Sequence, residues 1–267
     1  MNEDPTLSKL IKVYGVVLIL VFLCSCKTLY TRSFTHDYGA IVRGDSTRQQ
    51  ITLVFTGHEF ADGAKHIRNI LKKHEIKAAF FFTGHFYRNP SFKATIENLV
   101  KDGHYLGAHS NDHLLYCDWV KRDSLLVTQQ EFMDDLGSNY KEMEHFGISK
   151  AQAPYYLPPY EWYNNRIADW TADYGLQLIN MTHGTLSHAD YTTPEMSNYR
   201  NNNQIYSNIF SYESINTTGL NGFLLLMHIG TDAKRQDKFY DRLEELFLEL
   251  KSRKYDIIGL EKMLAKK

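Results

Sequence analysis

The chain has 267 residues, long enough for one large core and a length that α/β barrels often use as a single domain. Hydrophobic residues make up 43% of the sequence and aromatic residues 13%, which excludes a disordered protein. The formal net charge is −1, so the charge balance favours neither nucleic acid nor an anionic membrane surface as a partner.

The N-terminal residues have the features of an export signal. Basic residues precede an apolar run at 13–23, which is short for a bilayer span and has the length of a signal-peptide apolar region. The run ends in Leu23-Cys24-Ser25-Cys26, which resembles a bacterial lipobox. We predict a signal at residues 1–25 and a lipid on Cys26 that anchors the protein to the cell envelope, facing the periplasm or the cell exterior. An uncleaved single-pass anchor is the alternative.

Residues 26–48 are predicted to be a tether, and residues 49–267 the folded domain. In that domain, segments with strand and helix patterns alternate. Strands are predicted at 51–55, 77–82, 104–108, 177–180, 222–227 and 256–259, and helices at 63–74, 91–101, 128–146 and 237–253. Residues 183–218 are polar and irregular, so we expect a long loop or surface insertion there. The alternation predicts an α/β fold with a mostly parallel sheet and right-handed crossovers.

Two histidines follow directly on the third predicted strand, in His109-Ser110-Asn111-Asp112-His113. In a parallel barrel, side chains at the carboxyl ends of strands point into the active-site mouth. Two histidines four residues apart on one turn of helix face the same way and can bind one metal ion. His109 and His113 are therefore candidate metal ligands, although a pair of this kind can also arise by chance.

A later apolar strand, Leu224 to Met227, delivers His228 at its carboxyl end. An imidazole gains or loses a proton near pH 7, so His228 suits the role of general acid. The alternative is a structural histidine bonded to a neighbouring backbone carbonyl.

These motifs resemble those of the polysaccharide deacetylase family, of the NodB-homology type, from about residue 50 to the end. The family has a His-Ser-x-x-His metal motif, like residues 109–113, and a late Leu-x-Leu-x-His motif, like residues 224–228. The resemblance implies an irregular (β/α) barrel, a divalent metal ion, which we predict to be zinc, and an acetylated glycan as substrate. It implies that His109 and His113 hold the metal and that His228 protonates the leaving group.

The chain departs from the family at the first motif, where two adjacent aspartates, a general base and a metal ligand, follow strand one. Alignment at Phe55 puts Thr56 and Gly57 in these places, and neither side chain can do that chemistry. The next two residues, His58 and Glu59, can serve as a metal ligand and a base. A neutral His58 completes a three-nitrogen zinc site, and Glu59 takes the proton of the attacking water.

Asp62 is a rival metal ligand, because Asp62-Gly63 imitates the end of the family's first motif. It also stands where an N-cap belongs, before the predicted helix at 63–74, and we expect this capping role. A second departure lies in Leu157-Pro158-Pro159-Tyr160, which resembles the family's Arg-Pro-Pro-Tyr motif. The family's arginine holds the catalytic aspartate, so Leu157 in its place suggests a rearranged base.

Three further residues, Tyr160, Trp162 and Asp190, are predicted on the substrate side of the site. Tyr160 and Trp162 can form a platform for a sugar ring, or simply pack the core. Asp190-Tyr191 resembles the family's Asp-Trp motif, whose aspartate orients the acid histidine. Asp169-Trp170 matches that motif better in letters but falls inside a predicted helix.

The predicted function is metal-dependent hydrolysis of N- or O-acetyl groups on a polysaccharide or cell-wall glycan. One alternative is a catalytically silent glycan-binding protein that kept the pocket and lost the base. Another is a glycoside hydrolase, which needs two carboxylates across the scissile bond, such as Glu59 with Glu161 or Asp190. The paired histidines would have no purpose in that enzyme. The oligomeric state is left open.

Overall fold

The computed structural model describes residues 33–265, in which nine strands form one sheet. The strands are β1 (Thr35–Asp37), β2 (Ala40–Arg43), β3 (Gln50–Gly57), β4 (Ala79–Phe82), β5 (Tyr105–Ala108), β6 (Tyr155–Tyr156), β7 (Gln177–Leu178), β8 (Phe223–His228) and β9 (Asp256–Ile257). Their order is β1-β2-β8-β3-β4-β5-β6-β7, with β9 paired to β3. The strands from β8 to β7 in this order pair in parallel, as the strand–helix alternation predicts, whereas β1 and β2 pair antiparallel.

The register brings the ends of the central strands to one edge of the sheet. Thr56 of β3 lies opposite His228 of β8, and Gly57 lies opposite Phe82 of β4. Phe82 in turn lies opposite Ala108, the last residue of β5. Because these strands are parallel, the residues that follow β3, β4, β5 and β8 all emerge at this carboxyl edge.

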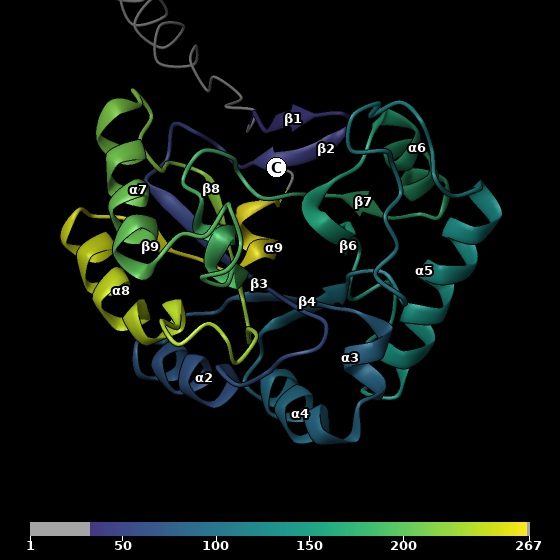
Figure 1. Cartoon of the computed structure of the whole chain (residues 1–267), viewed down its shortest axis with the longest axis horizontal. Helices are drawn as coiled ribbons and strands as arrows, with labels where there is room; N and C mark the ends of the chain where they lie inside the picture. Colours follow the sequence, from purple (N-terminus) through teal and green to yellow (C-terminus); the bar gives the residue numbers. More distant parts are fainter. Residues whose placement is uncertain (1–32, 266–267) are drawn as a thin grey trace, which may run out of the picture. The chain divides into compact units, whose positions relative to one another are not determined.

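The sheet curls into an irregular (β/α) barrel, which confirms the predicted fold class (Figure 1). A single parallel bridge between Ile41 and Ile179 joins β2 to the residues that follow β7. The backbone N–H of Asn180 donates to the carbonyl of Ile41 over 2.9 Å at the same place. The N-terminal strands therefore help to complete the curled sheet.

Most of the helices surround the sheet on its outer side, whereas the short C-terminal helix lies near the centre of the ring of strands (Figure 1). They are α2 (Ala64–Lys73), α3 (Gly84–Arg88), α4 (Lys93–Lys101), α5 (Gln129–Glu144), α6 (Asn165–Asp173), α7 (Asn202–Ile215), α8 (Leu243–Ser252) and α9 (Leu260–Met263). Short 3-10 turns lie at η1 (Pro90–Phe92), η2 (Pro159–Glu161), η3 (Ser187–Tyr191) and η4 (Phe239–Arg242). Figure 1 shows α2 to α6 along one part of the curve, and α7 and α8 on the side of β8 and β9.

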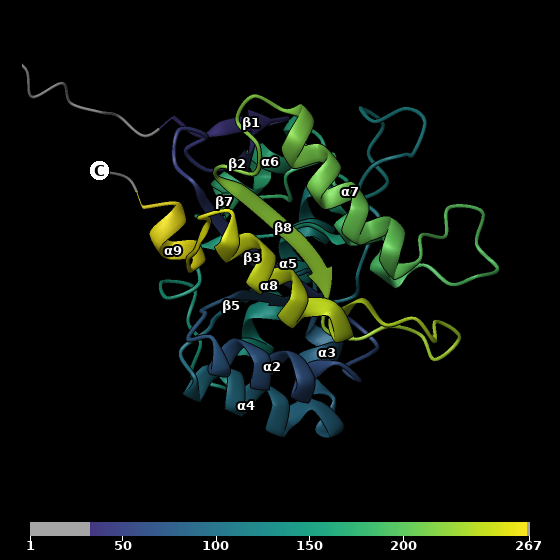
Figure 2. The same ribbon diagram turned by 90° about the vertical axis from the view of Figure 1, so that its left-hand side faces the viewer.

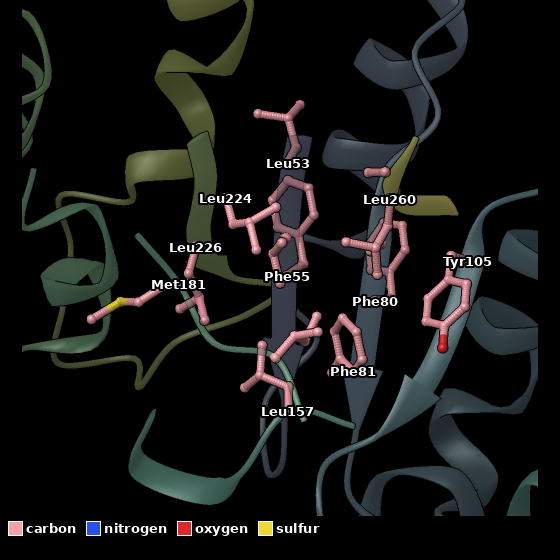
Figure 3. Packing of buried hydrophobic residues seen from close by; sticks show 14 of the residues in the cluster. Leu53, Phe55, Phe80, Phe81, Tyr105, Leu157, Met181, Leu224, Leu226 and Leu260 are labelled. Carbon is pink, nitrogen blue, oxygen red and sulfur yellow. The ribbon is translucent and has the colours of Figure 1, made fainter. Parts of the chain in front are cut away.

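The core lies between these layers and inside the barrel. Side chains of β3 are buried on both faces, because helices cover one face and the barrel interior fills the other. Phe55 stacks on Phe80 of β4 with ring centroids 5.1 Å apart, and Leu224 of β8 packs beside them (Figure 3). Full burial of one such side chain contributes roughly 1.5–3 kcal/mol.

The folded domain begins earlier than predicted. Residues 26–48 were expected to form a tether, but β1 and β2 lie in this segment and β2 pairs with β8. Ala40 and Ile41 are buried in the core. The tether prediction is therefore wrong for residues 35–43, because two strands this short, of which only β2 is buried, give too brief a pattern to stand out in the sequence.

The segment 183–218 is also more ordered than predicted. It contains η3 and the helix α7, which begins with a capping box formed by Asn201 and Gln204. Ile205 and Ile209, four residues apart, bury one face of this helix. The sequence did not predict α7 because most of its residues are polar and only a narrow apolar stripe is buried.

The predicted signal and Cys26 lie outside the described residues. Between residues 33 and 265, no helix is long and apolar enough to span a bilayer.

Candidate active site

A cleft of about 550 Å³ opens at the carboxyl edge of the sheet. Its walls include His58, His109, His113, Tyr160, Glu161 and His228. The loops beyond β8 and around α7 project on the side to which β8 points (Figure 2). The structure thus gathers at this edge most of the residues that the sequence singles out.

His109 is delivered directly by β5 and is almost fully buried. Its ring Nδ1 donates to the carbonyl of Leu157 over 2.9 Å, and its backbone N–H donates to Oδ1 of Asn139 over 2.9 Å. Burial lowers the pKa of His109 to about 3. The ring is therefore neutral at pH 7, with Nδ1 protonated and Nε2 free to bind a metal ion.

The residues between the two paired histidines form a tight turn and not the expected turn of helix. Ser110 has φ 71° and His113 has φ 56°, both in the left-handed region. The buried carboxylate of Asp135 in α5 accepts hydrogen bonds from the Ser110 hydroxyl and from the backbone N–H groups of Asn111 and Asp112, over 2.7–2.9 Å. Asp135 therefore holds the backbone conformation that turns His113 back toward His109.

Three imidazole rings cluster in the cleft. The ring centroids of His113 lie 4.7 Å from His58 and 5.2 Å from His109. Burial, together with the neighbouring His109 and His58, lowers the pKa of His113 to about 2. Burial also lowers the pKa of His58, with Glu59 partly opposing the shift. Nδ1 of His58 is hydrogen-bonded to the Thr83 hydroxyl over 3.0 Å.

The three neutral imidazoles are suitable donors for a divalent ion, but their rings are not yet arranged around a common point. All three rings favour the neutral form, and Nδ1 of both His58 and His109 is engaged elsewhere, which directs Nε2 to the cleft. As the rings stand, however, no three His, Cys, Asp or Glu side chains among residues 33–265 are placed to hold an ion together. Binding by this cluster requires the rings to rotate toward a common point.

His228 is paired with a buried carboxylate. Its Nδ1 donates to Oδ1 of Asp190 over 2.6 Å, and its backbone N–H donates to Oδ2 of the same residue over 2.9 Å. Burial favours the neutral ring, but Asp190 and then Glu161 outweigh this effect and raise the pKa of His228 above its ordinary value. Because Asp190 uses both oxygens on His228, its carboxylate holds that ring and is not directed at a substrate.

Glu59 and Asp62 take different places after β3. The side chain of Glu59 is 68% exposed, with Oε1 4.0 Å from Nε2 of His58, and it lines a hollow that adjoins the main cleft. Asp62 forms an ion pair with Lys238 at 3.0 Å and accepts hydrogen bonds from Tyr240 and from the backbone of Thr231.

The expected capping role of Asp62 is wrong. Helix α2 has Gly63 as its N-cap residue and no side-chain cap. The carboxylate turns instead to the segment after β8, where a cation and two hydrogen-bond donors satisfy it better than a helix end would.

Of the two aromatic residues predicted to contact a sugar, Tyr160 lines the cleft and Trp162 does not. Tyr160 lines the cleft, with its ring centroid 4.4 Å from that of His113. Trp162 stacks on Trp119, with ring centroids 5.7 Å apart, and donates its Nε1–H to the carbonyl of Asp118. Trp119, 55% exposed, lines the cleft in its place.

Sequence reasoning missed four residues of the site. Asp135 and Asn139 occupy successive buried turns of α5, and polar residues among the apolar positions Phe132 and Leu136 were the available signal. Trp119 carried no local signal, because its loop has no periodic pattern. Glu161 was considered only for a glycoside hydrolase.

Glu161 is half-buried in the cleft wall. Burial raises its pKa to about 7, with His228 opposing the shift and Asp190 adding to it.

Comparisons with known proteins agree with the motifs. A family model described as polysaccharide deacetylase matches residues 43–179, just over half of the chain. An uncharacterized 30.6 kDa protein from the fumA 3′ region of Geobacillus stearothermophilus is 26% identical over 237 residues, covering 87% of this chain and 77% of that protein. The peptidoglycan-N-acetylmuramic acid deacetylase PdaA of Bacillus subtilis is 28% identical over 149 residues, covering 55% of this chain and 52% of PdaA.

Solved structures share the fold. The peptidoglycan N-acetylglucosamine deacetylase Bc1960 has a TM-score of 0.68 at 17% identity, covering 86% of this chain and 94% of that chain. Bacillus subtilis PdaA, a family 4 carbohydrate esterase, has a TM-score of 0.65 at 21% identity, covering 85% of each chain. BA3943 from Bacillus anthracis, described as a CE4 family pseudoenzyme, has a TM-score of 0.66 at 17% identity, covering 86% of this chain and 70% of that chain.

Proposed function

Because this chain belongs to the polysaccharide deacetylase family, we propose that it removes N- or O-linked acetyl groups from a polysaccharide or cell-wall glycan. One observation carries the proposal. The cleft joins a cluster of three neutral histidines to His228, whose pKa is raised by a buried carboxylate. Metal ligands and a proton donor are the parts that hydrolysis of an acetyl group requires.

We propose that His58, His109 and His113 hold a divalent ion, with zinc expected from an all-nitrogen donor set. Such an ion, when bound, polarises the acetyl carbonyl and lowers the pKa of a water molecule. Within the protein, the carbonyl of Leu157 fixes the tautomer of His109, and Asp135 fixes the turn that carries His113. The first contact sets which nitrogen of His109 is free and the second sets the backbone of His113, and rotation of the rings then brings them to a common ion.

His228 is the proposed proton donor. Since Nδ1 is bound to Asp190, the proton that His228 can give is on Nε2. It passes to the leaving amine or alkoxide as the bond to the acetyl group breaks. Asp190 is a positioning residue, because it orients the ring and stabilises its protonated form.

Activation of water and contact with the sugar are the remaining tasks. The sequence offers Glu59 as a candidate base, and its carboxylate lies next to His58. Tyr160 is proposed to contact the sugar, and exposed Trp119 extends this aromatic surface to the rim of the cleft. Trp162 stacks on Trp119 and so supports this surface.

The test is acetate release. We expect the full chain to release acetate from at least one of an N-acetylated chito-oligosaccharide, an O-acetylated xylan and peptidoglycan. A chelator should abolish release, and added zinc should restore it. His228→Ala should retain the wild-type metal content and lose about 10²–10⁴-fold in kcat. New reducing ends without acetate would indicate a glycoside hydrolase instead.

A second function is favoured by one observation. Thr56 and Gly57 occupy the places of the family's two aspartates, so a carboxylate is missing where the family has its base. A silent glycan-binding protein on this fold would bind one of the three glycans by calorimetry and release acetate from none.

We further propose that a lipid on Cys26 anchors the protein in a bacterial cell envelope, with the domain facing the periplasm or the cell exterior. The lipobox-like Leu23-Cys24-Ser25-Cys26 supports this location. A glycan outside the cytoplasm is then within reach of the cleft.

A further inference from the structure

The carboxylates near the cleft differ in the number of hydrogen bonds and ion pairs that they form. Asp190 is bound to His228 through both oxygens, and Asp62 is paired with Lys238 and Tyr240. Glu161 lines the main cleft, and within residues 33–265 no hydrogen bond or ion pair engages its carboxylate. A half-buried carboxylate without a partner is costly unless a ligand or a reaction uses it.

The turn that places Glu161 in the cleft has a strained backbone conformation. Tyr160 has φ 58° and Glu161 has φ 53°, so two successive residues with side chains adopt the left-handed conformation. Each such residue costs roughly 1–2 kcal/mol, and such strain persists where the surroundings enforce it, often at functional sites. Here the fully buried Asn180 donates to the carbonyl of Glu161 over 2.9 Å. The fold therefore supports a strained turn whose result is a carboxylate in the cleft.

Neither of the places that the family's two aspartates occupy supplies a carboxylate from β3 here. Thr56 is buried and its hydroxyl has no partner among the described residues. Gly57 has no room for a side chain, because a Cβ there would lie 2.8 Å from Ile229 and 2.9 Å from both Phe82 and Phe86. A base for this cleft must come from another segment.

We propose that Glu161 is the general base of this site, an inference that rests on the deacetylase function proposed above. Its carboxylate accepts a proton from water as the water oxygen bonds to the acetyl carbonyl carbon. The bond from that carbon to the glycan nitrogen or oxygen then breaks, and His228 gives its proton to the departing atom. Acetate and the free amine or alcohol leave, and the proton on Glu161 returns to His228.

The electrostatic setting agrees with this role. Burial raises the pKa of Glu161 to about 7, near the pH at which a general base is most effective. The same residue raises the pKa of His228, so the base and the acid influence each other across the cleft. Glu59, in contrast, is mostly exposed, and bulk water competes for its carboxylate.

The experiment compares glutamine variants of the full chain, with acetate release and metal content measured on the same samples. Glu161→Gln should lose about 10²–10⁴-fold in kcat, the contribution of a positioned base, and keep the wild-type metal content. Glu161→Asp should recover part of the loss. Added formate should restore part of the activity of Glu161→Ala, because a small carboxylate can enter the vacated space. Glu97→Gln, an exposed change on α4, is the matched control.

The outcomes separate this inference from the proposed function. If the wild type releases acetate and Glu161→Gln has normal activity, the proposed role of Glu161 as base is wrong, whereas the proposed deacetylase function stands. The base is also overturned if Glu59→Gln loses more activity than Glu161→Gln, or if Glu161→Gln loses its metal. A wild type that releases no acetate overturns both.

Discussion

The histidines of the cleft divide into two groups by the direction in which their pKa values move. Burial without a carboxylate lowers the pKa of His109 to about 3 and that of His113 to about 2. His228 is also buried, but Asp190 raises its pKa. One environment thus favours neutral ligands, and a neighbouring one favours a charged acid, which is how a site assigns different tasks to the same side chain.

Asp190→Asn should lower the pKa of His228, because the variant loses the negative charge that favours the protonated ring. Since the folded-state pKa in the wild type exceeds the unfolded value of about 6.5, this pairing stabilises the fold fully below that pH and ceases to do so as pH rises through the folded-state pKa. The variant should therefore lose more unfolding free energy at pH 6 than at pH 9. NMR titration of His228 and urea unfolding at both pH values measure these effects.

Asp169→Asn, in the Asp-Trp pair on α6, is the control and should leave the His228 titration unchanged. Equal titrations in the wild type and Asp190→Asn would contradict the role of Asp190.

At the scale of elements, α5 positions the histidine turn from outside the sheet. Asp135 binds the turn at three points, and Asn139, one turn further along the helix, binds the backbone N–H of His109. A capping box between Thr128 and Glu131 fixes where this helix begins. The helix and the turn therefore act as one unit, and the register of α5 determines where the histidines lie.

Asp135→Ala should destabilise the protein by about 1–3 kcal/mol for each buried donor left without an acceptor. The free energy of unfolding in urea measures this. Asp134→Ala, an exposed neighbour on the same helix, should change it far less. An equal effect of the two substitutions would show that the turn does not depend on the Asp135 carboxylate.

The sequence predicts the central strands and helices because their apolar periodicity is local. It also predicts His109 and His113, which follow one strand in a motif. It does not predict Glu161 or Trp119, since their places in the cleft depend on contacts with distant segments, such as the Asn180 bond to Glu161. The positions of these residues follow from the folded turn and not from any pattern in their own segment.

At the scale of the whole molecule, the cleft draws on segments spread along most of the domain. His58 follows β3, His109 follows β5, Glu161 lies in η2 and His228 ends β8. The parallel register brings them to one edge, so the site depends on the complete curled sheet. The N-terminal strands belong to that sheet, and a truncation that removes residues 35–43 removes part of the domain.

Cys26→Ala should abolish fatty-acid labelling of the protein and release it from the membrane fraction, because the lipobox-like motif loses its acceptor. Labelling with a radioactive or alkyne fatty acid, followed by fractionation, measures both effects. Cys24→Ala, which changes a cysteine inside the predicted signal, should remain labelled. Persistent labelling of Cys26→Ala would refute the anchor.

The packing around Gly57 limits how this sequence can change over evolutionary time. An aspartate there requires Phe82, Phe86 and Ile229 to shift or to become smaller, since a Cβ would lie within 2.9 Å of all three. Large-to-small changes of buried residues typically cost about 2–5 kcal/mol, and none of them alone supplies a carboxylate. The path back to a two-aspartate motif therefore crosses less stable intermediates with no gain in function. The packing around Gly57 therefore opposes stepwise recovery of the two-aspartate motif in this sequence.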